Sequence, residues 1–190
     1  SLITASNQVR IGSSTVTSIG GYTGWSNVSD SRFKMDVQEN VPGLEFINQL
    51  RPVTYHLDVN GIRDFLGEDT RRDGSEEELH EKSQEQKSLT GNSVSEKERI
   101  TYTGFIAQEV EKVSVELDFE FSGVDKPLNE NSLYGLRYAE FVVPLVKAVQ
   151  ELNALNETQK IAIEELIEAV DELKSQNERL TQRLERIENK

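Results

Sequence analysis

A heptad repeat over the last 49 residues, 142–190, constrains the fold of this chain more than any other feature. With Val142 at position a, seven heptads follow without a break in register. The a positions are Val142, Val149, Asn156, Ile163, Val170, Asn177 and Leu184, and the d positions are Leu145, Leu152, Gln159, Leu166, Leu173, Leu180 and Ile187. A strict period of about 3.5 residues is typical of a left-handed coiled coil. We expect a rod of about 70 Å. It is too long to fold back on a small domain, so its apolar seam must meet other chains.

The positions beside the seam bear on the number of chains. Apolar residues widen the stripe at Val146 and Ile167 (position e) and at Leu155, Ala162 and Ala169 (position g), and a wide stripe favours three or more strands. The asparagines at position a favour a dimer and fix the register. The sequence favours a parallel homotrimer and leaves the dimer open.

Composition excludes several classes of partner. The chain has 190 residues and a net charge of −13, which opposes nucleic acid and anionic membrane surfaces as partners. No apolar run approaches the roughly 18 residues that a membrane-spanning helix needs. There is no cysteine, and the carboxylates of 76–85 lack the spacing of a calcium loop, so we expect no metal and no cofactor. His56 and His80 are the only histidines, and neither is placed for a Ser-His-Asp triad.

The chain is expected to have three parts. Residues 1–28 are rich in Ser, Thr and Gly with short β-type runs, which fits either a loop-rich hairpin or the β-rich end of an upstream fibre whose strands pair between chains. Residues 29–140 form a small domain that contains a polar insertion at 61–99. Residues 141–190 form the coiled-coil helix. Because no secretion signal begins the sequence, we expect a C-terminal piece of a longer polypeptide.

Hydrophobic periodicity indicates an α+β domain. Helices are expected over 41–50 and 107–113. Strands are expected over 53–59 and 100–106, with weaker strand patterns at 117–121 and 134–138. Within the insertion, Ile62, Phe65 and Leu66 indicate a short helix, and residues 76–87 are helical at best. The predicted fold class is a small mixed helix and strand domain followed by a long C-terminal helix.

The candidate chemistry lies in the hexapeptide that runs from Ser29 to Lys34. A serine hydroxyl becomes a nucleophile when a base takes its proton, and a lysine amine can be that base when burial removes its charge. The structural alternative is that Asp30 or Ser31 caps a following turn and that Arg32 and Lys34 are surface cations.

Four motifs in order resemble a known family. The hexapeptide is followed by Leu-Arg-Pro-Val-x-Tyr at 50–55, Gly-Phe-Ile-Ala-Gln-Glu-Val at 104–110, and a Pro-Leu-x-Lys-Ala-x-Gln-Glu-Leu segment within 138–152 that runs into the heptads. This order resembles the intramolecular chaperone domain of endosialidase-type phage tailspikes, which also occurs in other tail fibres and in bacterial surface proteins. The segment 61–99 is longer than the family's pattern.

The resemblance implies a function and a site. Such domains trimerise their parent chain, help its fibre to fold and then release themselves by autoproteolysis. By position, Ser29 corresponds to the nucleophile and Lys34 to the base, while Asp30 and Arg32 occupy accompanying motif positions. The resemblance implies a single-turnover serine endopeptidase on a virion tail fibre or a bacterial surface, whose partners are two further copies and the upstream fibre of its own chain.

Simple ring size favours one bond for the cut. The Ser29 hydroxyl reaches the Val28 carbonyl through a five-membered ring, whereas attack on its own carbonyl needs a four-membered one. We expect one cut adjacent to Ser29. Two other functions stay open at this stage: a permanent trimerisation module that is never cut, and carbohydrate binding through Tyr22 and Trp25, for which two aromatic residues are few.

Overall fold

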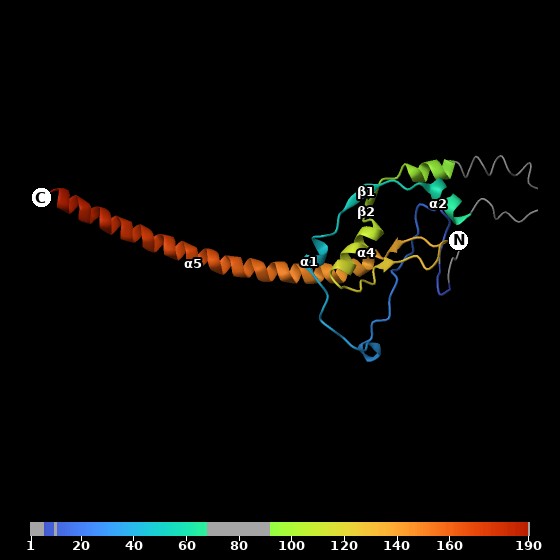
Figure 1. Cartoon of the computed structure of the whole chain (residues 1–190), viewed down its shortest axis with the longest axis horizontal. Coiled ribbons are helices and arrows are strands. Elements are labelled where there is room, and N and C mark those ends of the chain that lie inside the picture. The colour runs from blue at the N-terminus through green and yellow to red at the C-terminus, as the bar shows by residue number, and fades with distance from the viewer. Residues whose placement is uncertain (1–5, 10, 68–91, 190) are drawn as a thin grey trace, which may run out of the picture. The chain divides into compact units, whose positions relative to one another are not determined.

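The computed structural model of the chain describes residues 6–9, 11–67 and 92–189 (Figure 1). The chain divides into two compact units. One comprises residues 1–40 and 49–141, and the other comprises residues 41–48 and 142–190. The predicted helix at 76–87 lies outside the described residues.

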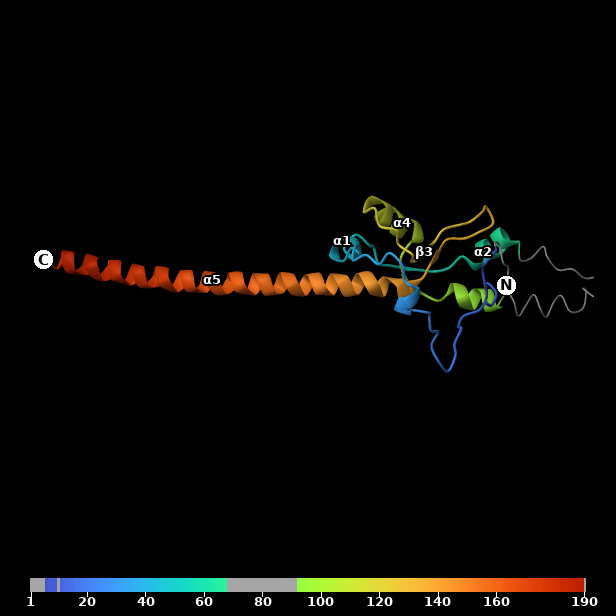
Figure 2. The same ribbon diagram turned by 90° about the horizontal axis from the view of Figure 1, so that it is seen from below.

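The second unit is built on the long C-terminal helix. Helix α5 runs unbroken from Val142 to Glu188, and Figure 2 shows it continuous from end to end. It begins at the residue where the heptad repeat begins, which confirms the predicted helix. Its a and d side chains are exposed in the single chain: Val142 is 56% exposed, Leu166 65% and Ile187 70%. Among the residues that the structure describes, none covers this apolar seam.

A short helix docks beside this seam. Helix α1 (Leu44–Ile47) packs on the first turns of α5, where Phe46, Pro144 and Ala148 are buried. Pro144 and Ala148 occupy heptad positions c and g, so α1 leaves the a and d side chains free. The predicted helix over 41–50 is wrong in length, because Gly43 takes a non-helical conformation (φ −97°, ψ −102°) and the helix ends at Ile47.

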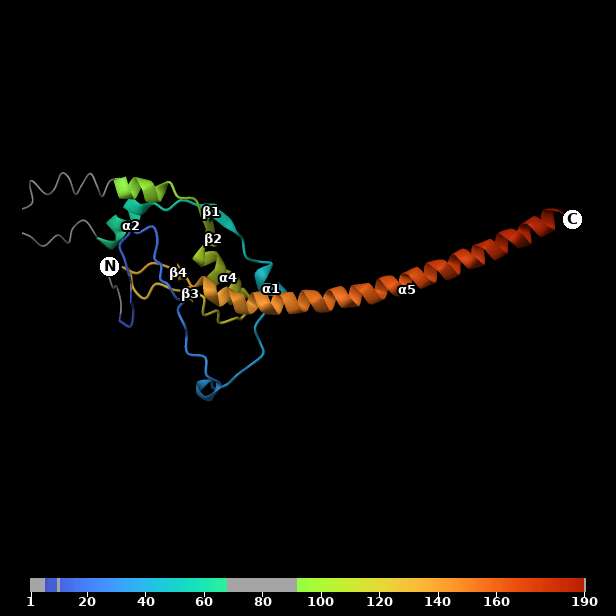
Figure 3. The same ribbon diagram turned by 180° about the vertical axis from the view of Figure 1, so that it is seen from behind.

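The first unit holds two small antiparallel sheets. Strand β1 (Val53–Tyr55) pairs with β2 (Tyr102–Gly104), and β3 (Val124–Asp125) pairs with β4 (Gly135–Leu136). Figure 3 shows β3 and β4 side by side. The expected strand at 100–106 is confirmed over its middle, and the pattern at 134–138 yields β4. The pattern at 117–121 was wrong: these residues form a turn and an extended segment without strand pairing.

Helices connect and cover these sheets. Helix α2 (Val59–Leu66) begins where strand β1 had been predicted to continue, because Asp58 caps the helix by accepting a hydrogen bond from Gly61 N at 2.8 Å. Helix α4 (Ala107–Glu116) confirms the helix expected at 107–113 and is one turn longer. Residues 92–98 are helical as well. The mixed helix and strand fold class is thereby confirmed.

Aromatic rings close the core of the first unit. The ring of Phe141, in the 3₁₀ helix η2 (Tyr138–Phe141), stacks on Phe105 at 5.3 Å and meets Phe121 edge-on at 4.8 Å. Gly104 allows the Tyr138 hydroxyl to approach its backbone, since a Cβ there would overlap that oxygen.

The N-terminal segment is loop-like in the single chain. The described residues 6–9 and 11–28 form turns and extended stretches with no strand, which agrees with a loop-rich segment. Tyr22 and Trp25 are exposed and form no cluster with other aromatic rings among the described residues. Strands that pair between chains stay a prediction.

Candidate functional site

A single 3₁₀ turn shapes the hexapeptide. The turn η1 (Ser31–Phe33) starts at Asp30, whose carboxylate accepts a hydrogen bond from Arg32 N at 3.0 Å. It ends where Lys34 N donates to Ser31 O at 3.2 Å. This turn reverses the chain, so the side chain of Lys34 returns to Ser29. Lys34 Nζ donates a hydrogen bond to Ser29 Oγ at 2.9 Å.

Asp30 and Arg32 hold the turn together. Arg32 Nη2 lies 2.6 Å from Asp30 Oδ2, and Arg32 Nε also donates to the same carboxylate. The side-chain hydrogen bonds of Arg32, followed by its backbone N–H, hold the pKa of Asp30 below its usual value, and Asp30 in turn raises the pKa of Arg32. Asp30 therefore caps the turn, as the structural alternative in the sequence analysis predicts. Asp30 and Arg32 thus fix the backbone that brings Ser29 and Lys34 together.

The Ser29–Lys34 pair lies at the surface of the single chain. Both residues are exposed, and Val28, whose carbonyl precedes Ser29, is 89% exposed. In this hydrogen bond Lys34 is the donor and Ser29 the acceptor. The arrangement has the right pair of groups at the right distance for nucleophile and base. Deprotonation of the amine requires an environment that excludes water.

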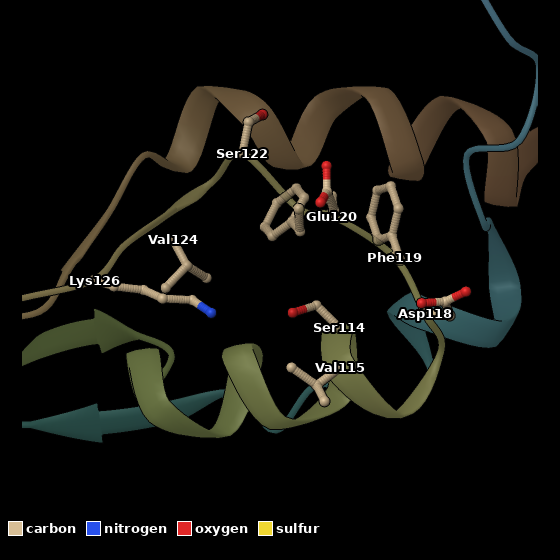
Figure 4. A pocket seen from close by; sticks show the side chains of 9 residues that line it. Ser114, Val115, Asp118, Phe119, Glu120, Ser122, Val124 and Lys126 are labelled. Atoms are coloured by element: carbon tan, nitrogen blue, oxygen red, sulfur yellow. The ribbon is translucent and has the colours of Figure 1, made fainter.

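A second pairing of serine and lysine occurs at a pocket, which sequence reasoning missed. Figure 4 shows this pocket of about 460 Å³, lined by residues of α4 and of the segment that follows it. Both Ser114 and Lys126 line it, but each is bound to Glu111: Ser114 Oγ donates to Glu111 O at 2.8 Å, and Lys126 Nζ lies 2.7 Å from Glu111 Oε1. The Glu111 carboxylate raises the pKa of Lys126. Because this lysine is held in its charged form, the pocket is not a second nucleophile and base site.

The remaining candidates have structural partners. His56 Nε2 lies 3.1 Å from Thr101 Oγ1, and His80 is outside the described residues. Among the residues that the structure describes, no group of three or more histidine, aspartate or glutamate side chains could hold a metal ion. No helix in the same part of the chain is long and apolar enough to cross a membrane.

The fold and the site together define a class: a small helix and strand domain that opens with a paired serine and lysine and leads into a long helix with a free apolar seam. Residues 29–119 match the family model described as chaperone of endosialidase, and the match begins at Ser29. The match over this segment confirms the resemblance found in the sequence. No curated protein and no solved structure matches the chain.

Proposed function

We propose that the chain is a C-terminal intramolecular chaperone that trimerises a fibre-like parent protein, helps it to fold and then releases itself by one cut adjacent to Ser29. The observation that carries the proposal is the 2.9 Å hydrogen bond between Lys34 Nζ and Ser29 Oγ, at the start of a segment that matches the chaperone of endosialidase family. The parent is a fibre of a phage tail or of a bacterial surface.

The cut follows from the groups present. The neutral amine of Lys34 takes the proton of Ser29 Oγ, and the oxygen attacks the Val28 carbonyl through a five-membered ring. The C–N bond between Val28 and Ser29 breaks, and Lys34 returns the proton to the departing amine of Ser29. Water then hydrolyses the Val28–Ser29 ester. The products are a Val28 carboxylate and a new chain that begins with Ser29.

Assembly supplies the regulation in this proposal. Ser29 and Lys34 are both exposed in one chain. Burial against other copies disfavours the charged form and lowers the pKa of a lysine. Cleavage is therefore expected after the copies associate through the seam of α5, whose a and d side chains are exposed along the helix. Each chain makes one cut, with no turnover.

Mutation of the pair tests the peptidase step. Ser29→Ala and Lys34→Ala should each leave the full-length chain on a denaturing gel, while Ser31→Ala, which removes a hydroxyl two residues away, should still be cut. Hydroxylamine should accelerate cleavage of the wild type by trapping the ester. Intact mass spectrometry identifies the bond. A wild-type chain that forms trimers and stays uncut would contradict the peptidase step.

The exposure of the pair also supports a second candidate, a permanent trimerisation module. In that case, the same domain clamps three chains and the amine of Lys34 stays charged in the assembly. The mass of the mature parent protein separates the two candidates: loss of a C-terminal fragment supports self-release, and retention of that fragment supports the permanent module.

A further inference from the structure

The loop that carries the candidate pair exposes three large apolar side chains. Phe33 is 75% exposed, Met35 87% and Val37 78%, and they alternate along the chain on both sides of Lys34. We call these three residues the ridge. Over residues 35–40, the described hydrogen bonds are limited to one between the side chains of Asn40 and Gln38. Three large apolar side chains without cover, on a loop with so few contacts, indicate a surface that another element covers.

The same unit has an apolar groove of matching character. A groove of about 490 Å³ lies between β1, the start of α4 and the segment around β4. Its rim includes the half-exposed side chains of Tyr55, Ile106, Tyr134 and Tyr138. Phe105 and Leu136 contribute to its apolar lining. A groove lined mainly by aromatic and aliphatic side chains suits an apolar insert rather than a charged one.

Ridge and groove do not meet within one chain, since all three ridge side chains remain exposed. The chain also limits how far the ridge can travel, because residue 43 is held on α5: Leu44 N donates to Glu151 Oε2 at 2.8 Å. Six peptide links join Val37 to Gly43, a reach of about 20 Å. Helices in a coiled coil lie only about 10 Å apart. In a parallel assembly along α5, this length of chain is therefore enough for Val37 to span the distance between neighbouring helices.

Symmetry favours a second copy as the occupant. A contact between two different surfaces of identical chains is heterologous, and it closes into a ring when the copies are related by a rotation axis. A parallel trimer has such an axis. Each ridge can then fill the groove of the next copy, so that all three ridges and all three grooves are occupied.

We propose that Phe33, Met35 and Val37 of one copy dock in the groove of a second copy, and that this docking encloses Lys34. The proposal rests on the trimer of the proposed function and adds the surface that removes water from the amine. Lys34 lies between Phe33 and Met35 in the chain, so docking of both neighbours brings the second copy beside the Ser29–Lys34 pair, whose side chains are joined by a hydrogen bond. Lys34 would thus become active as a base only after its loop has docked on a neighbouring subunit.

Photo-crosslinking from position 35 tests the docking without relying on cleavage. Met35 is the only methionine of the chain, so photo-methionine labels this position alone once the initiator methionine is removed. The full chain carrying Ser29→Ala is prepared in ¹⁴N and ¹⁵N forms, which are unfolded, mixed and refolded together. We expect mixed-isotope crosslinks from Met35 to peptides that contain Tyr55, Ile106 or residues 134–138. Crosslinks confined to single-isotope pairs, or mapped to other peptides, would overturn the proposal.

Cleavage gives the second readout. Met35→Ser should slow the cut about tenfold or more among trimers isolated by size exclusion, because the ridge loses part of its apolar surface. Gln38→Ser, on the same loop but outside the ridge, should cleave at the wild-type rate. If Met35→Ser trimers cut as fast as wild type, the docking proposal fails and the peptidase proposal stands. If the wild type stays uncut while the crosslinks form between copies, the docking stands and the peptidase step fails.

Discussion

Gly43 is the position where a single added methyl group should do the most damage to this chain. A Cβ at residue 43 would lie 2.7 Å from the backbone nitrogen of Ala148 and 2.5 Å from Glu151 Oε2. The carboxylate can move, but the backbone of α5 cannot. Gly43→Ala should therefore push α1 away from α5.

The cost follows from what α1 contributes. Overpacking that α1 absorbs by a small shift costs about 1–3 kcal/mol. Complete release of α1 would expose Phe46, worth about 1.5–3 kcal/mol, and would break the hydrogen bond from Leu44 N to the Glu151 carboxylate, worth about 1.5–3 kcal/mol. We expect a loss of about 2–4 kcal/mol in the free energy of unfolding, between these two limits.

Urea denaturation followed by circular dichroism measures this loss, at one fixed chain concentration because the stability of an oligomer depends on concentration. Gly24→Ala is the matched control, since a Cβ there meets nothing within 4 Å. It should change stability by less than about 0.5 kcal/mol. Glu151→Gln keeps an oxygen acceptor for Leu44 N and should cost less than Glu151→Ala. If Gly43→Ala is as stable as Gly24→Ala, the close approach of α1 to α5 is not what holds the two helices together.

Two further predictions concern the seam and the turn. Ile163→Lys places a charge at position a and should abolish both trimer formation and cleavage. Ile161→Lys, at the outward position f, is the control and should leave both intact. Sedimentation equilibrium measures the oligomeric state of each variant, and equal behaviour of the two would refute the assigned seam. The pKa of Asp30 lies below its usual value of 3.8 because of its hydrogen bonds from Arg32. The ion pair should therefore be fully formed above pH 3.8 and should be lost as the pH falls through the lower pKa of the folded chain. An NMR titration that places the Asp30 carboxyl above 3.8 would contradict this.

The parts of the fold that were predictable are those with a long, regular pattern. Helix α5 starts at Val142 as expected, because seven heptads average out any single ambiguous residue. The strand predicted over 53–59 is confirmed at Val53–Tyr55, but it does not extend to Val59, because alternation alone cannot separate an extended Val59 from the first residue of a helix. The available signal was Asp58, because aspartate favours the N-cap position of a helix. In the structure its carboxylate accepts a hydrogen bond from the backbone N–H of Gly61.

The candidate site was predictable in identity but not in geometry. A spacing of five residues between Ser29 and Lys34 does not by itself bring their side chains together, since an extended segment would hold them far apart. The 3₁₀ turn decides the distance, and Asp30 builds that turn with Arg32. The anchor of α1 was beyond reach of the sequence because Leu44 and Glu151 are 107 residues apart, and no local pattern links them.

The unsatisfied surfaces of the single chain give a physical reason for the order of events in the proposed function. In the described parts of the chain, the seam of α5 and the ridge beside Lys34 are exposed, whereas the turn that pairs Ser29 with Lys34 is already formed. A catalytic geometry that precedes assembly would be harmful if the base were active at once, because an early cut would separate the parent fibre from the seam that gathers its copies. In the proposed function, burial of the lysine against other chains supplies the delay, because burial disfavours the charged form of a lysine amine. The slow step should then be docking rather than chemistry, and dilution below the assembly threshold should stop cleavage even though the Ser29–Lys34 pair is intact.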